Sequence, residues 1–93
     1  RLTDAIKMYE YVLEARIRTL GNTHHHTRIT RNDLAQTYEQ AGDLPKAISM
    51  YVDLLDDHIR IYGPDHESTI EVRDRLEAAK RKLEQQENNS TSE

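Results

Sequence analysis

The stretch that decides the fold runs from Leu34 to Tyr51 and reads LAQTYEQAGDLPKAISMY. On both sides of Gly42 its apolar and aromatic residues recur at steps of three and four, which is the period of an amphipathic helix. Gly42 predicts a helix end, because a residue without a Cβ suits a left-handed cap. Asp43 predicts the next helix start, because its carboxylate can accept from free backbone amides. The stretch therefore predicts two helices joined by a short turn.

The same periodicity extends outward in both directions, with further breaks at Gly21 and Gly63. We predict an all-α fold without strands. Its four antiparallel helices lie near Thr3–Leu20, Thr27–Ala41, Leu44–Tyr62 and Glu67–Glu87. Residues 1–87 are expected to form one helical repeat domain. From 88 to 93 the composition turns to Asn, Ser, Thr and Glu, which predicts a disordered C-terminal tail.

An internal repeat relates the two halves of the chain. Ala5 and Ile6 match Ala47 and Ile48 at an offset of 42 residues (47 − 5 = 42). The same offset pairs Leu2 with Leu44, Met8 with Met50, Tyr9 with Tyr51, Leu13 with Leu55, Ile17 with Ile59, Gly21 with Gly63, His24 with His66, Arg31 with Arg73 and Leu34 with Leu76. Because the matches include loop positions, shared helix propensity alone does not explain them. We predict two repeat copies, at about residues 2–43 and 44–85.

Two-helix repeats of about this period occur in HEAT, armadillo and tetratricopeptide repeat (TPR) proteins. A set of signature spacings resembles the TPR pattern: Leu34, Ala35, Tyr38, Gly42, Ala47 and Tyr51. Gly63-Pro64-Asp65-His66 and its altered copy Gly21-Asn22-Thr23-His24 add to the resemblance, as does the run Arg31–Ala35. Together they are similar to the long repeats of kinesin light chains and many bacterial regulatory proteins. The resemblance implies a TPR-like α-solenoid. If A is the first and B the second helix of a repeat, the helix order is B-A-B-A, so the chain begins on a second-type helix and finishes on a first-type helix.

The last helix departs from this pattern. Glu77 stands where Ala35 stands in the first copy, and Lys80 stands where Tyr38 stands. A charged residue at a close-packing position prevents another helix pair from stacking there in the usual way. We therefore expect residues 69–87 to form a capping helix, which solenoids need at their ends.

The resemblance implies a non-catalytic module that binds a protein or peptide partner through the concave face of its repeats. The groove residues expected from it are Ile29, Asn32, Gln36, Glu39 and Gln40. Asn32 suits the backbone of an extended peptide, because one amide supplies both a donor and an acceptor. The alternative interpretation is that these are ordinary solvent-facing polar residues.

A second hypothesis is structural: the chain is a spacer or self-associating piece of a larger solenoid. The first helix carries an apolar stripe of Leu2, Ala5, Ile6, Tyr9, Val12 and Leu13. In the predicted order only one neighbouring helix, near Thr27–Ala41, covers it. An apolar strip left open is an association surface, so we predict a homodimer through the first helix.

Composition argues against several other functions. The net charge of −4 does not suit a protein that binds nucleic acid or an anionic membrane, which would carry a basic excess. The chain has no Cys, which excludes disulfides and thiolate metal sites and favours a cytoplasmic location. No apolar run reaches the length of a membrane-spanning helix.

No catalytic residue, cofactor or metal ligand is predicted, so the chain is not expected to be an enzyme. The abundant helix carboxylates are expected on solvated polar faces, without the burial that catalysis requires: Asp53, Asp56, Asp57, Glu10 and Glu14. The run His24–His26 has no Asp, Glu or Cys at a ligand-like spacing, and successive residues on a helix point in different directions. It is expected to be a solvated loop.

Overall fold

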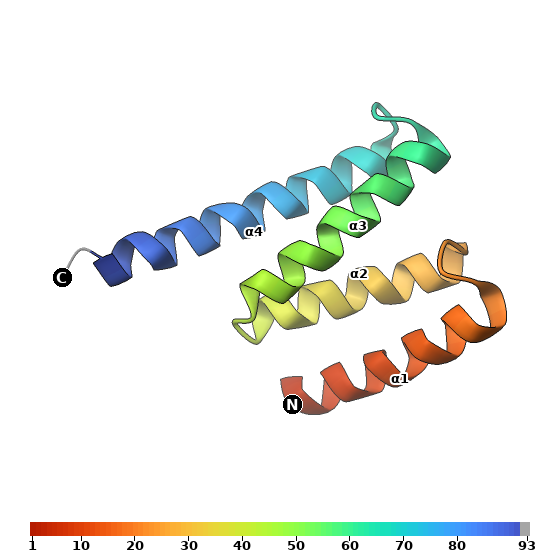
Figure 1. Ribbon diagram of the computed structural model, residues 1–93, viewed down its shortest axis with the longest axis horizontal. Helices are drawn as coiled ribbons and strands as arrows, with labels where there is room; N and C mark the ends of the chain where they lie inside the picture. The colour runs from red at the N-terminus through yellow and green to blue at the C-terminus, as the bar shows by residue number, and fades with distance from the viewer. Residues whose placement is uncertain (92–93) are drawn as a thin grey trace.

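The computed structural model describes residues 1–91 and contains four α-helices (Figure 1). They are α1 (Leu2–Leu20), α2 (His25–Gln40), α3 (Leu44–Tyr62) and α4 (Glu67–Thr91). The predicted all-α fold is confirmed, and no strand occurs in residues 1–91. None of these helices has the length and apolar character that crossing a membrane requires.

The end of α4 differs from the prediction. The helix runs to Thr91, so the predicted boundary at Glu87 is too early, and residues 88–91 are helical instead of part of a disordered tail. The reason is local: no Gly or Pro interrupts this segment, and an established helix adds each further residue at little cost. Residues 92–93, the rest of the predicted tail, lie outside the described residues.

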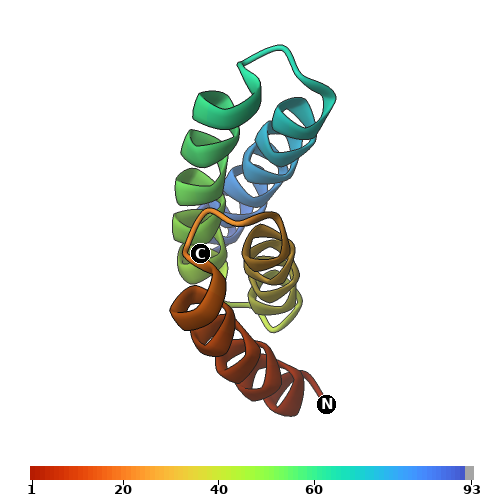
Figure 2. The same cartoon turned by 90° about the vertical axis from the view of Figure 1, so that its right-hand side faces the viewer.

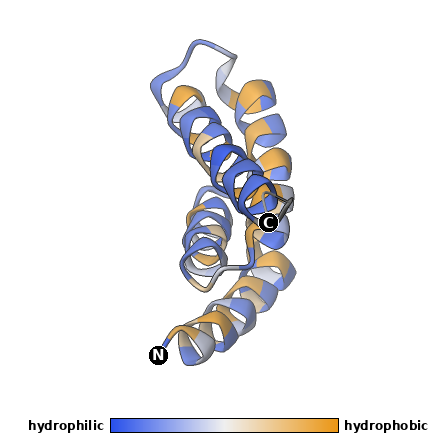
Figure 3. Ribbon diagram, turned by 90° about the vertical axis from the view of Figure 1, so that its left-hand side faces the viewer, coloured by the Kyte–Doolittle hydropathy of each residue, from blue (hydrophilic) through white to orange (hydrophobic). Residues whose placement is uncertain are grey.

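The helices form two layers. Each helix packs chiefly on the next one along the chain. In the side view α1 and α3 lie on one side, and α2 and α4 lie on the concave side of a curved stack (Figure 2). Hydropathy colouring shows more apolar ribbon in α1 and α3 than in α2 and α4 (Figure 3). The molecule is flat and elongated, with extents of 49 × 34 × 15 Å. This arrangement is a short α-solenoid.

The core lies where α2 meets α3. Ala35 and Ala47 are fully buried, and their small side chains let the two helices approach closely. Tyr38 and Tyr51 fill the space beside them and are also buried. Tyr38, Ala47 and Tyr51, three of the signature residues, therefore belong to one buried cluster. The same cluster continues into Leu34, Leu44, Leu76 and Ala79.

The loops before α2 and α4 share one geometry. His24 Nδ1 accepts a hydrogen bond from the backbone amide of His26 (3.1 Å), and His66 Nδ1 accepts one from that of Ser68 (3.0 Å). The glycine that opens each loop, Gly21 or Gly63, has a φ near +90°, a conformation that favours residues without a Cβ. The 42-residue offset therefore corresponds to equivalent structure as well as to similar sequence.

Arginines close these two loops in the same way. Arg31 donates to the carbonyl oxygen of Asn22, and Arg73 donates to that of Pro64, each over 3.2 Å. Both bonds bind a helix back onto the loop that precedes it. The loop geometry therefore sets where α2 and α4 begin, and with it the positions of the side chains on their concave faces.

Candidate binding groove

Two hollows lie on the face shared by α2 and α4. The first has a volume of about 320 Å³ and is lined mainly by Gln36, Glu39, Gln40, Arg75 and Lys82, over Tyr51. The second, of about 180 Å³, is lined by Ile29 and Asn32 of α2 together with residues of α3 and α4. All five groove residues expected from the sequence thus line these hollows. That they bind a partner remains a prediction.

Asn32 offers an unused hydrogen-bonding atom in the second hollow. Its Oδ1 is buried and accepts no hydrogen bond from any of the described residues. Buried polar atoms in folded proteins nearly always have a partner, in the protein or in solvent. Because this oxygen is closed to solvent, an amide N–H from a bound segment would reach it only after the Asn32 side chain turns into the hollow.

Glu39 connects neighbouring helices, so its carboxylate is not free in the groove. Its carboxylate accepts from the hydroxyl of Tyr51 (3.1 Å) and from Nζ of Lys82 (2.5 Å), so it joins α2 to both α3 and α4. Burial raises the pKa of the Tyr51 hydroxyl, and the neighbouring Glu39 carboxylate raises it further. Because both oxygens of Glu39 are engaged, the available polar groups of the first hollow on α2 are the amides of Gln36 and Gln40.

The sequence analysis did not predict that residues of α4 line the groove. Arg75 and Lys82 line the first hollow, and Nη1 of Arg75 is buried without a hydrogen-bond partner in the described part of the chain. Its other terminal nitrogen lies 3.7 Å from a carboxylate oxygen of Glu71. The repeat offset could have identified Lys82, because it is the counterpart of Gln40 in the second copy.

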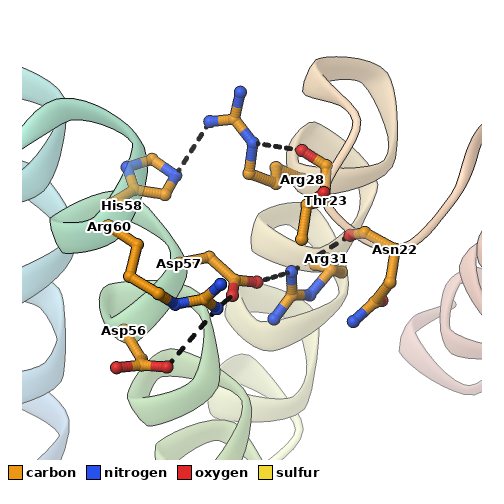
Figure 4. A network of polar contacts seen from close by, with 8 residues as sticks. All are labelled: Asn22, Thr23, Arg28, Arg31, Asp56, Asp57, His58 and Arg60. Atoms are coloured by element: carbon orange, nitrogen blue, oxygen red, sulfur yellow. Dashed lines mark hydrogen bonds and ion pairs between the residues drawn. The ribbon is translucent and has the colours of Figure 1, made fainter.

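Arg28 holds the floor of the second hollow together (Figure 4). Its Nε donates to the carbonyl oxygen of Thr23 over 2.9 Å and its Nη2 donates to the Tyr62 hydroxyl over 3.1 Å. Nη1 lies 3.3 Å from Nε2 of His58. Burial lowers the pKa of His58, and the positive charge of Arg28 lowers it further. A neutral His58 can accept from Arg28, and protonation of the imidazole would remove this hydrogen bond.

Asp57 contradicts the expectation of a solvated carboxylate. It is 5% exposed and lies between two arginines, with Oδ2 2.5 Å from Nη1 of Arg31 and Oδ1 bonded to Arg60 (Figure 4). A buried charge is tolerated only when it is paired, and α2 supplies the pairing cation. Asp53 and Asp56 are exposed, as expected. Asp57 therefore couples α2 to α3.

Glu10 and Tyr38 make a similar connection between α1 and α2. Glu10 is exposed, as expected for a solvated carboxylate, yet it accepts a hydrogen bond from the Tyr38 hydroxyl. Burial, together with this carboxylate, raises the pKa of Tyr38 to about 12. The hydroxyl is therefore a stable donor at neutral pH, and the contact is structural.

The histidine run differs from the expected loop, because His24 is the N-cap of α2 and His25 and His26 form the first residues of that helix. All three side chains are exposed, as expected. The rings of His24 and His26 stack with their centroids 5.4 Å apart, while His24 also caps α2. Across residues 1–91 no group of three or more His, Cys, Asp or Glu side chains is arranged to hold a metal ion.

The two-layer stack of helix pairs with a hollowed concave face defines the class of the protein as a helical-repeat module. Within that class, residues 1–57 match the tetratricopeptide repeat family, and the chain belongs to it. Such repeats are generally protein-interaction modules and typically non-catalytic. A search of curated proteins and a search of solved structures found no match.

Proposed function

We propose that the protein binds an extended segment of a partner protein in the groove between α2 and α4, without catalysing a reaction. The observation that carries this proposal is the convergence of Ile29, Asn32, Gln36 and Gln40 on two adjoining hollows of one face. The buried, unpartnered Oδ1 of Asn32 supports it, because a peptide amide is the complementary group. The unpartnered Nη1 of Arg75 adds a donor from the opposite helix.

The repeat type and the location form part of the same proposal. The equivalent loops before α2 and α4 support a long repeat of the kind found in kinesin light chains. The absence of Cys supports a cytoplasmic setting, because proteins of that reducing compartment are rarely stabilised by disulfides.

The test is to replace Asn32 and Gln36 together by Ala. Peptides selected from a displayed random library on the unaltered protein serve as probes, and calorimetry measures their affinity. We expect the double variant to bind at least about tenfold more weakly, because an unpaired polar group at a binding site costs on the order of 1–3 kcal/mol. Ser49→Ala on the exposed face of α3 is the matched control and should bind as the unaltered protein does. A double variant that no longer folds would show that these residues are structural.

A second candidate function is self-association of the chain as a structural element. The observation that favours it is the exposure of α1, none of whose residues is buried. The stripe expected from the sequence is not the exposed one, because Ile6, Tyr9 and Leu13 pack against the core. The large apolar residues that α1 exposes are Leu2, Met8, Tyr11, Ile17 and Leu20. Sedimentation equilibrium across a tenfold range of concentration tests this candidate. A mass that stays at that of one chain throughout would contradict it.

A further inference from the structure

The outward face of α1 is uncovered by any described residue. By the 42-residue offset α1 is the counterpart of α3, yet α3 has six buried residues and α1 has none. Met8 is 66% exposed, whereas its counterpart Met50 packs against the core beside α2. The molecule itself therefore shows that this helix surface can be covered by a neighbouring helix.

Tyr11 is not explained by the stacking of a further repeat. It is 76% exposed, the largest value among the exposed large apolar residues of the described chain. Its counterpart on α3 is Asp53, which stays exposed although α2 and α4 both pack on α3. If another repeat packed on α1 in the way that α2 packs on α3, Tyr11 would occupy the position of Asp53 and would stay exposed to solvent. An aromatic side chain at this position therefore points to a different neighbour.

The exposed stripe of α1 is complementary to itself. Asp4, Met8, Tyr11, Ala15 and Arg18 follow one another at steps of four and three, so they lie along one helix face. The apolar residues are central and the opposite charges are at the two ends. When a second α1 lies antiparallel with a two-fold axis near Tyr11, Asp4 of each copy faces Arg18 of the other. A parallel arrangement would place like charges together.

The flank of this stripe is complementary in the same arrangement. Lys7 and Glu14 lie on the same side of the stripe, nearly equidistant from Tyr11, and both are exposed. A two-fold axis perpendicular to both helices keeps each flank on its own side, so Lys7 of one copy approaches Glu14 of the other. In the single chain Glu14 forms an ion pair with Arg18, over 3.6 Å between exposed side chains, and such pairs contribute little to stability.

The opposite end of the molecule cannot accept α1 of a second copy in a head-to-tail stack. On α2 the residues that meet α3 include Arg31, Ala35 and Tyr38. Their counterparts on α4 are Arg73, Glu77 and Lys80, and the last two are exposed charges. Desolvating them against an apolar helix would be unfavourable, so a closed two-fold pair is favoured over an open array.

We infer that the occupant of the α1 face is a second copy of this chain, packed antiparallel, α1 against α1, across a two-fold axis near Tyr11. This inference rests on the self-association candidate and specifies its geometry. The 19 residues of α1 span about 28 Å, so one helix pair buries less than the roughly 800 Å² per partner of a standard interface. The dimer is therefore weak, with a dissociation constant in the micromolar range.

Cysteine cross-linking tests the orientation, and the chain has no Cys of its own to interfere. Lys7→Cys and Glu14→Cys are made separately, one with a tag so that the products differ in mass, and the two are mixed under mild oxidation. We expect the 7–14 disulfide to form faster than the 7–7 and 14–14 products. The matched control is Ser49→Cys, the counterpart of Lys7 on α3, which should cross-link only at the background rate.

Charge exchange tests the end pairs by sedimentation equilibrium from about 10 to about 500 micromolar. Asp4→Arg alone and Arg18→Asp alone should each weaken the dimer roughly tenfold, because each creates two like-charge contacts. The combined variant Asp4→Arg with Arg18→Asp should return to within about threefold of the unaltered protein. All five residues changed here and in the cross-linking are exposed, so the fold, followed by circular dichroism, should be retained.

The outcomes separate this inference from self-association in general and from peptide binding in the groove. A dimer that forms 7–7 and 14–14 disulfides at least as fast as the 7–14 product would overturn the antiparallel arrangement and leave self-association standing. A chain that stays monomeric at every concentration would overturn both, while library peptides could still bind the groove. Failure of the combined charge variant to restore the dimer would also contradict the proposed pairing.

Discussion

Helices α1 and α3 are two copies of one sequence pattern in two different environments. Ala5 corresponds to Ala47, and Tyr9 corresponds to Tyr51. Ala47 and Tyr51 are fully buried, whereas Ala5 and Tyr9 are only partly so. The difference arises because α3 packs between α2 and α4, while in the described structure α1 packs chiefly against α2. An apolar pattern thus makes a helix able to be buried, and the number of neighbours decides how far burial proceeds.

The largest expected effect comes from placing a charge at the small-residue contact. Ala47→Asp should lower the free energy of unfolding by about 4 kcal/mol, because it puts an unpaired carboxylate into a fully buried helix contact. Ala5→Asp, the same change at the counterpart on α1, should cost only about 1 kcal/mol. Urea unfolding followed by circular dichroism measures both. Equal losses would show that α1 is packed as tightly as α3.

The next effect concerns the buried ion pair that α3 has and α1 lacks, since Ala15 stands where Asp57 stands in the second copy. Asp57→Ala should cost about 3 kcal/mol, because it leaves the buried guanidinium of Arg31 without its carboxylate. The neighbouring exposed carboxylate provides a control: Asp56→Ala should change stability by less than about 0.5 kcal/mol. If thermal and urea unfolding show similar losses for the two variants, the ion pair does not stabilise the fold.

A pH effect on stability is expected from His58, which stands where Arg16 stands in the first copy. The pKa of His58 is lowered in the folded state by burial and by Arg28, so the unfolded chain takes up the proton first as the pH falls. The contribution of neutral His58 to the free energy of unfolding is complete above the pKa of an unfolded-chain histidine, about 6.5. As the pH falls from there to the lower pKa of the folded state, this contribution is lost, at no more than about 1.4 kcal/mol per pH unit.

The test is to measure the free energy of unfolding of the unaltered protein and of the His58→Gln variant between neutral and mildly acidic pH. The variant should show a shallower decline with falling pH than the unaltered protein. His25→Gln, which removes an exposed imidazole, should leave the decline unchanged. An identical pH dependence in all three proteins would contradict the assigned role of His58.

The smallest effect on stability is expected at the position where the two copies differ on their solvent faces. Tyr11→Asp and Asp53→Tyr should each alter the free energy of unfolding by no more than about 0.5 kcal/mol, because both side chains are exposed. Measured at low protein concentration, where the chain is monomeric, a larger loss for Tyr11→Asp would show that Tyr11 contributes to the fold of the single chain.

Much of the groove could be predicted from the sequence, because helix periodicity places residues on faces without knowledge of their neighbours. Periodicity placed Asn32, Gln36 and Gln40 on the side of their helix opposite Leu34, Ala35 and Tyr38, and the resemblance to tetratricopeptide repeats implied that this side lines a groove. The roles of Glu39 and Arg75 could not be found, since the first depends on contacts with Tyr51 and Lys82 and the second on the approach of α4 to α2. Such contacts join residues far apart in the chain, and periodicity along one helix carries no information about them.

The sequence by itself determined the helices, their breaks at Gly21, Gly42 and Gly63, and the duplication that orders them into a repeat stack. These are local properties, set by side-chain period and backbone conformation within a few residues. Only the tertiary structure decided that Asp57 is buried beside Arg31, because the cost of burying a charge depends on the partner that packing provides. It also decided which residues of α1 form its open face, because packing on α2 covers Ile6, Tyr9 and Leu13 and leaves Met8 and Tyr11 exposed.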